Sequence, residues 1–128
     1  MKKGFTLLEI MVVLIIIGIL ATISFTHYGG FKEKTLQKEA VSNLKLIIAA
    51  ERIYRMEEGS YYNSTSMSEI NDNLKLNLPI DKVNWNYTTV SSNTMTNVCA
   101  QATRDGQTSW HMMFNDNDTA TGNCKNYK

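Results

Sequence analysis

Residues 5–25 read FTLLEIMVVLIIIGILATISF, an apolar run with a single charged residue, Glu9. From Ile10 to Phe25, 13 of 16 residues are apolar and none is charged. At 1.5 Å per residue, a helix over this run is about 30 Å long, the thickness of a bilayer's hydrocarbon core. Strands usually end well short of this length, so the run predicts a membrane-spanning helix. Lys2 and Lys3 precede it and predict a cytoplasmic N-terminus.

The next segment, residues 31–58, mixes apolar side chains with six basic and five acidic ones. At 100° per residue, one half of a helical wheel collects eight apolar residues: Leu36, Ala40, Val41, Leu44, Ile47, Ile48, Ala50 and Tyr54. Glu51 interrupts this apolar face, and Gly59 is a natural stop. The simplest interpretation is one helix from about Phe5 to Glu58, with Gly29-Gly30 as its weak point.

Residues 59–128 are rich in Asn, Thr and Ser. Ser66 or Ser68 is in position to cap a short helix that runs through about Leu76. Alternation of large apolar and polar residues predicts a strand at Val83–Val90, and Thr94–Thr103 is a second strand candidate. The hairpin signal Asp105-Gly106 leads into a third, Ser109–Phe114. We expect Asn115–Asn123 to be a polar loop. The expected core comprises Leu44, Ile47, Ile48, Tyr54, Trp85, Tyr87, Val98, Trp110, Met112 and Phe114.

Composition excludes several classes of protein. The chain has 128 residues, which is the size of one domain, and a formal charge of +1, which gives no general attraction to nucleic acid or anionic lipid. With 43% hydrophobic and 20% charged residues it is not a wholly disordered chain, and one Pro and seven Gly exclude a collagen-like one. The mean hydropathy of −0.25 averages an apolar N-terminal run with a polar remainder and describes neither.

The N-terminal residues Lys2-Lys3-Gly4-Phe5-Thr6-Leu7-Leu8-Glu9, followed by Ile10–Ile23, resemble the start of type IV pilins and of the related pseudopilins of type II secretion. The resemblance implies that a prepilin peptidase cuts after Gly4 and that Phe5 becomes the methylated N-terminus. Glu9 is then the fifth residue of the mature chain. The family often has a proline where this chain has Thr26, so the shape of the helix is left open.

Glu9 needs a partner, because a charge near the bilayer core costs about 2.5–3.5 kcal/mol on insertion scales. The apolar run offers no cation. The resemblance implies that the partner is the freed Phe5 amine of a neighbouring subunit in a helical filament. Two alternatives stay open: a single-pass anchor whose Glu9 reaches the inner interface, and a secretory signal peptide, which the length of the run disfavours.

The two cysteines, Cys99 and Cys124, lie outside the membrane in this topology, where disulfides persist. We expect them to pair, as in the C-terminal disulfide loop of many type IV pilins; the alternative is two free thiols. We expect no metal site: His27 and His111 are the only other soft ligands, and Asp116-Asn117-Asp118 lacks the remaining positions of a calcium loop. No catalytic constellation or cofactor motif is present, and the basic residues Lys34, Lys38, Lys45 and Arg52 read as a solvated face rather than a nucleic-acid site.

The expected fold is α+β: a long N-terminal helix, apolar in its first half and amphipathic in its second, packed on a small antiparallel sheet in a pilin-like head. We divide the chain into a leader at 1–4, the transmembrane or filament-core half of the helix at 5–30, its amphipathic half at 31–59, and a globular head at 60–128 that carries the disulfide loop. The expected function is a type IV pilus subunit and not an enzyme. The alternatives are a type II secretion pseudopilin or a membrane-anchored extracytoplasmic binding module. The implied partners are further copies of the chain, the prepilin peptidase, the pilus assembly platform and the inner membrane, before export into an extracellular filament.

Overall fold

The computed structural model describes residues 4–81, 84–91, 97–105, 108–113, 119–122 and 124. Helix α1, Leu7–Glu58, begins in one compact unit, Met1–Thr35, and ends in a second, Leu36–Lys128. The single helix that the sequence predicts from about Phe5 to Glu58 is confirmed apart from its first two residues.

The first unit holds the apolar part of α1. The helix starts after Thr6, whose side-chain oxygen accepts the Glu9 N–H at 3.3 Å and whose carbonyl accepts the N–H groups of Glu9 and Ile10. Further along, the hydroxyls of Thr22 and Ser24 donate to the carbonyls of Ile19 and Leu20 within the helix. These polar groups are therefore satisfied without water, as an apolar environment requires.

In the second unit, α1 continues to Glu58 and ends at Gly59. Gly59 has a φ of 78°, and its N–H donates to the Arg55 carbonyl at 2.9 Å. The left-handed conformation at this position is easily adopted only by glycine, so the predicted stop is confirmed.

Helix α2, Met67–Leu74, follows after a short connection. Ser66 occupies the N-cap position, but its side chain makes no capping hydrogen bond, so the predicted capping chemistry of Ser66 is wrong. Instead, the Ser64 hydroxyl accepts the Ser66 N–H at 3.0 Å and donates to the Glu69 carboxylate. The helix ends two residues before the expected Leu76, because Lys75 turns left-handed with a φ of 55°.

The sheet is antiparallel, with strands β1, β2, β3 and β4 in that order. The strands span Asn86–Ser91, Val98–Thr103, Trp110–Met113 and Ala120–Thr121. The first three coincide with the three predicted strands, although they are shorter. Val83, Thr94, Gly106 and Phe114, which those predictions included, lie outside the described residues.

We expected a polar loop at Asn115–Asn123. This expectation is wrong for Ala120–Thr121, which form β4 and pair with His111 and Trp110 of β3. Both residues of β4 are exposed, so this short edge strand is held by backbone pairing and has no apolar alternation that a sequence could show.

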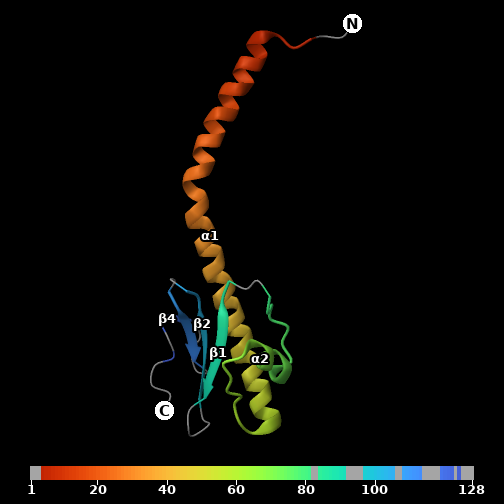
Figure 1. Cartoon of the computed structure of the whole chain (residues 1–128), viewed down its shortest axis with the longest axis vertical. Coiled ribbons are helices and arrows are strands. Elements are labelled where there is room, and N and C mark those ends of the chain that lie inside the picture. The colour runs from red at the N-terminus through yellow and green to blue at the C-terminus, as the bar shows by residue number, and fades with distance from the viewer. Residues whose placement is uncertain are drawn as a thin grey trace. The chain divides into compact units, whose positions relative to one another are not determined.

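The core of the second unit lies between α1, α2 and the sheet. Figure 1 shows α2 and the C-terminal part of α1 beside β1. Two hydrogen bonds fix α1 against the start of the sheet: Trp85 Nε1 donates to the Leu36 carbonyl at 2.8 Å, and Asn43 donates to the Tyr87 hydroxyl at 2.9 Å. Seven of the ten predicted core residues are buried, namely Leu44, Ile47, Ile48, Trp85, Tyr87, Val98 and Met112. Tyr54 and Trp110 are half-buried against them, and Phe114 is not described. The α+β fold is therefore confirmed.

Candidate functional site

The bond between Gly4 and Phe5 lies before the helix, in chain that forms no regular structure. Both residues are exposed, and Phe5 has 78% of its surface accessible. A Cβ built at Gly4 would meet no atom within 4 Å, so nothing in the fold requires a glycine there. An irregular, exposed peptide of this kind is the form in which a chain is accessible to a peptidase.

Glu9 lies in the first turn of α1, four residues after Phe5. A carboxylate there interacts favourably with the N-terminal end of the helix dipole. The neighbours of Glu9 along the helix are Leu8 and Ile10, both exposed. The structure therefore presents one acidic side chain inside an otherwise apolar surface.

That apolar surface is the main feature of the first unit. Leu7–Phe25 forms a 19-residue segment with a mean hydropathy of 2.7, none of it buried in the isolated chain. It is the one segment among the described residues with the length and composition to cross a membrane. Because an exposed apolar surface of this size is unfavourable in water, the segment needs lipid or other protein around it.

The cysteines come together in the second unit. Cys99 in β2 and Cys124 form a disulfide with Cα atoms 6.1 Å apart, so the expected pairing is confirmed. The Cys124 N–H also donates to the Gln101 side-chain oxygen at 2.8 Å. The bridge closes a 25-residue stretch that contains β3 and β4 and ties the end of the chain to the centre of the sheet.

The remaining candidates do not come together in the part of the chain that the structure describes. His111 Nδ1 lies 3.2 Å from the Gly122 carbonyl oxygen, a contact that fixes β3 to the end of β4. No group of three metal-ligating side chains occurs among the described residues. The Asp116-Asn117-Asp118 tract and the side chain of His27 lie outside those residues. Lys34, Lys38, Lys45 and Arg52 are all exposed on α1.

The second unit also holds two features that the sequence pattern did not predict. One is the complete burial of Glu51, since a charged residue on an apolar face is ordinarily expected at its edge. The other is a second apolar face of α1, formed by Leu46, Ala49 and Ile53, beside the end of α2. The three- and four-residue spacing of these side chains is typical of a helix face. The buried face of α1 has the same period and contains more residues, so the sequence pattern points to the buried face first.

An exposed, irregular N-terminus, an apolar helix long enough to cross a membrane with one acid in its first turn, and an antiparallel head with a C-terminal disulfide together make a pilin-like architecture. Residues 1–25 match the family model of the prokaryotic N-terminal methylation motif. The resemblance to pilins and pseudopilins is thereby confirmed for the N-terminal part of the chain.

Three relatives show the same relationship. The chain is 41% identical to the type IV major pilin protein PilA of Myxococcus xanthus over 60 residues. This match covers 47% of the chain and 27% of PilA. Over the same length the chain is 42% identical to the type II secretion system core protein G of Aeromonas hydrophila and 40% identical to that of Pectobacterium carotovorum. The matches cover 42% and 38% of those two proteins, so the chain spans less than half the length of these relatives. No solved structure matches the chain.

Proposed function

We propose that the chain is a structural subunit of an extracellular filament of the type IV pilus kind, assembled through its N-terminal helix. The observation that carries this proposal is the exposed Leu7–Phe25 segment next to a prepilin motif. Lipid surrounds the segment in the precursor, and the segments of neighbouring copies replace lipid in the filament. The chain acts by assembly and not by catalysis.

In this proposal the precursor is held in the inner membrane with Lys2 and Lys3 on the cytoplasmic side. A prepilin peptidase removes Met1–Gly4 and methylates Phe5, after which the assembly platform takes up the subunit. Removal of the leader deletes Lys2 and Lys3, so the formal side-chain charge changes from +1 to −1. Until the cut, the Phe5 nitrogen is an amide and offers no charge to a partner.

Cleavage after Gly4 would free the Phe5 amine, which is the cation that the apolar run around Glu9 lacks. We assign the Phe5 amine of one copy as the partner of Glu9 in the next, a head-to-tail contact that does not close and so generates a filament. A buried pair of this kind also fixes the axial position of each subunit, because an unpaired charge in an apolar environment is costly.

Intact mass after expression in the native host tests the processing step. The proposal requires the loss of Met1–Gly4 and one added methyl group, and a full-length, unmethylated chain would instead support a membrane-anchored binding module. Gly4→Leu gives the matched control. Since the position is open in the fold, this variant should insert normally and accumulate as the full-length precursor.

Substitution of Glu9 tests the assembly step. We expect Glu9→Ala to be processed and inserted like the wild type but to be absent from filaments, because the Phe5 amine then has no partner. Glu58→Ala removes an exposed acid from the other end of α1 and should assemble normally. Filaments of Glu9→Ala at the wild-type yield would refute the pairing.

A pseudopilin of type II secretion is the second candidate, and two of the relatives reported above favour it. The Cys99–Cys124 bridge favours the pilus, because it matches the C-terminal disulfide loop that the pilin resemblance implies. Electron microscopy of sheared surface fibres distinguishes the two candidates. The pilus proposal requires this chain to be their dominant component.

A further inference from the structure

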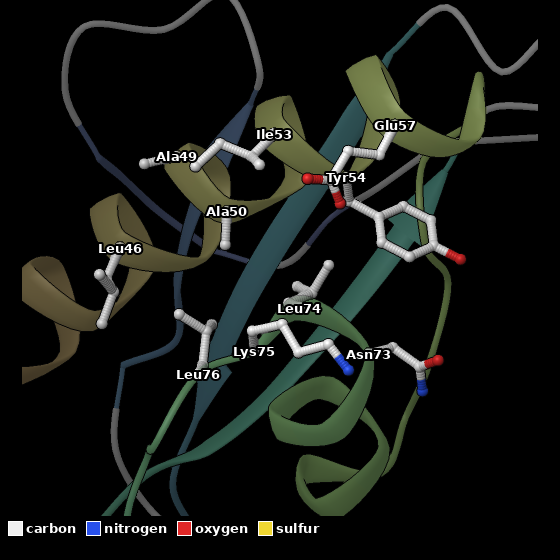
Figure 2. A pocket seen from close by; sticks show the side chains of 10 residues that line it. All are labelled: Leu46, Ala49, Ala50, Ile53, Tyr54, Glu57, Asn73, Leu74, Lys75 and Leu76. Carbon is white, nitrogen blue, oxygen red and sulfur yellow. The ribbon is translucent and has the colours of Figure 1, made fainter.

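A groove lies within the second unit, between the C-terminal part of α1 and the end of α2 (Figure 2). Its volume is about 290 Å³, far more than the roughly 30 Å³ that one water molecule occupies in the liquid. The apolar lining consists of Leu46, Ala49, Ala50 and Ile53 from α1, of Leu74 at the end of α2, and of Leu76 two residues beyond it. A groove of this size and lining suits apolar side chains.

The floor of the groove continues as an apolar ridge on α1, formed by Leu46, Ala49, Ile53 and Met56. At 100° per residue these four positions fall within about 80° of one another, on the opposite side of the helix from the buried Leu44 and Ile48. Leu46, Ile53 and Met56 keep 48%, 55% and 79% of their surfaces exposed. Helix α1 therefore has two apolar faces here, and only one of them is covered by the head.

We propose that the groove and the apolar ridge bind the Leu7–Phe25 segment of a second copy of this chain. This inference rests on the proposed function and adds to it a specific surface of the head that takes part in assembly. The described residues include two uncovered apolar surfaces, this groove with its ridge and the Leu7–Phe25 helix, and each would remove the other from water.

The dimensions of the two surfaces agree. From Leu46 to Met56 the ridge is about 15 Å long, and a helix over Leu7–Phe25 is about 28 Å long, so one segment covers the whole ridge. Small side chains lie at the middle of each surface, Ala49 and Ala50 in the groove and Gly18 and Ala21 in the segment. Small residues at such positions let two helix backbones approach closely.

The charges also agree with this occupant. Within the lining, the charged residues are Glu57 and Lys75, one of each sign, and both are exposed. The groove therefore has no net charge for a charged ligand to complement. Ile10–Phe25 is uncharged, so it can cover the apolar floor while Glu57 and Lys75 stay hydrated.

Substitution of Ile53 tests the surface. We expect Ile53→Glu to fold, insert and be processed normally but to enter filaments at least about tenfold less than the wild type, because the new carboxylate would be buried against an apolar helix. The matched control is Ile80→Glu. The exposed fraction of Ile80 is 52%, similar to that of Ile53, but Ile80 does not line the groove. Equal filament yields from the two variants would overturn the proposal.

Photo-crosslinking identifies the occupant. A benzophenone side chain at position 46 in assembled filaments, made from a mixture of isotopically light and heavy copies, should crosslink to peptides within residues 5–25 of another copy. Crosslinks to residues 36–128 of another copy, or to a different protein, would refute the proposed occupant. If the wild type is neither cut after Gly4 nor found in filaments, the proposed function itself fails. If the wild type assembles and Ile53→Glu does too, only the groove proposal fails.

Discussion

At the scale of single residues, Glu51 is the most unusual side chain in the head. It is 0% exposed, and its Oε2 accepts the Tyr62 N–H at 2.9 Å, while Oε1 has no hydrogen-bond partner among the described residues. Burial raises the pKa of Glu51 from 4.5 to about 7, although the Tyr62 hydrogen bond acts in the opposite direction. The carboxyl group anchors the chain that leaves α1, while its burial favours the protonated form over the charged one.

This burial makes the stability of the head depend on pH. A group whose pKa is higher in the folded state stabilises that state below its unfolded pKa and loses this contribution as pH rises through the folded value. We therefore expect the free energy of unfolding to fall between about pH 4.5 and pH 7, by on the order of 3 kcal/mol. Urea unfolding of the full chain in detergent micelles, followed by the fluorescence of Trp85 and Trp110, measures this change.

Glu51→Gln is the informative variant, because it keeps an oxygen for the Tyr62 N–H and removes the ionisation. Its stability should vary much less over the same pH range. Glu57→Gln changes an exposed acid on the same helix and should behave like the wild type. A wild-type stability that is constant from pH 5 to pH 8 would rule out a protonated Glu51 in the folded head.

At the scale of elements, the sequence predicted α1 well because its two halves carry strong signals, a long apolar run and then a 3.6-residue period. Alternation predicts β1 and a hairpin signal predicts β3, but the sequence does not give the ends of the three longer strands, because pairing between strands sets where a strand stops. β4 has no such pattern and depends on its partner β3. The sequence did not predict the apolar ridge. A helical wheel shows that a face is apolar, but it does not show which of two apolar faces the head covers.

Gly18, in the middle of the apolar segment of α1, gives a prediction about this element. A Cβ built there meets no atom within 4 Å, and Leu is a better helix former than Gly by nearly 1 kcal/mol. Gly18→Leu should therefore insert and be processed at least as well as the wild type. If neighbouring helices approach closely at this position, however, the added side chain will block assembly, and we expect filament yield to fall at least about tenfold.

Ile17→Leu is the matched control for Gly18→Leu, since it changes the adjacent residue at constant volume and should assemble normally. Immunoblots of membrane and sheared-fibre fractions compare the two variants directly. Normal filaments from Gly18→Leu would show that no helix of another copy packs closely at this position.

At the scale of the whole molecule, the chain combines a unit with an exposed apolar surface, which is unfavourable in water, and a unit with a buried core. None of the described side chains of the first unit is buried, and in the proposed function lipid or other copies surround its apolar segment. The second unit is small and carries a core, a four-stranded sheet and one disulfide. A small domain buries a limited fraction of its surface, so the disulfide is expected to contribute a large share of its stability.

Removal of the disulfide tests how much the Cys99–Cys124 bridge contributes to the stability of the second unit. Cys99→Ala combined with Cys124→Ala opens a 25-residue loop, and the chain-entropy model gives a loss of about 3–4 kcal/mol in the free energy of unfolding. Alanine is preferable to serine because Cys99 is fully buried and a hydroxyl there would add its own penalty. The measurement is urea unfolding of the full chain in detergent, with and without a reductant. The reductant should lower the stability of the wild type to that of the double variant and leave the variant unchanged. A double variant as stable as the oxidised wild type would show instead that the strand pairing of β3 and β4 holds the end of the chain without the bridge.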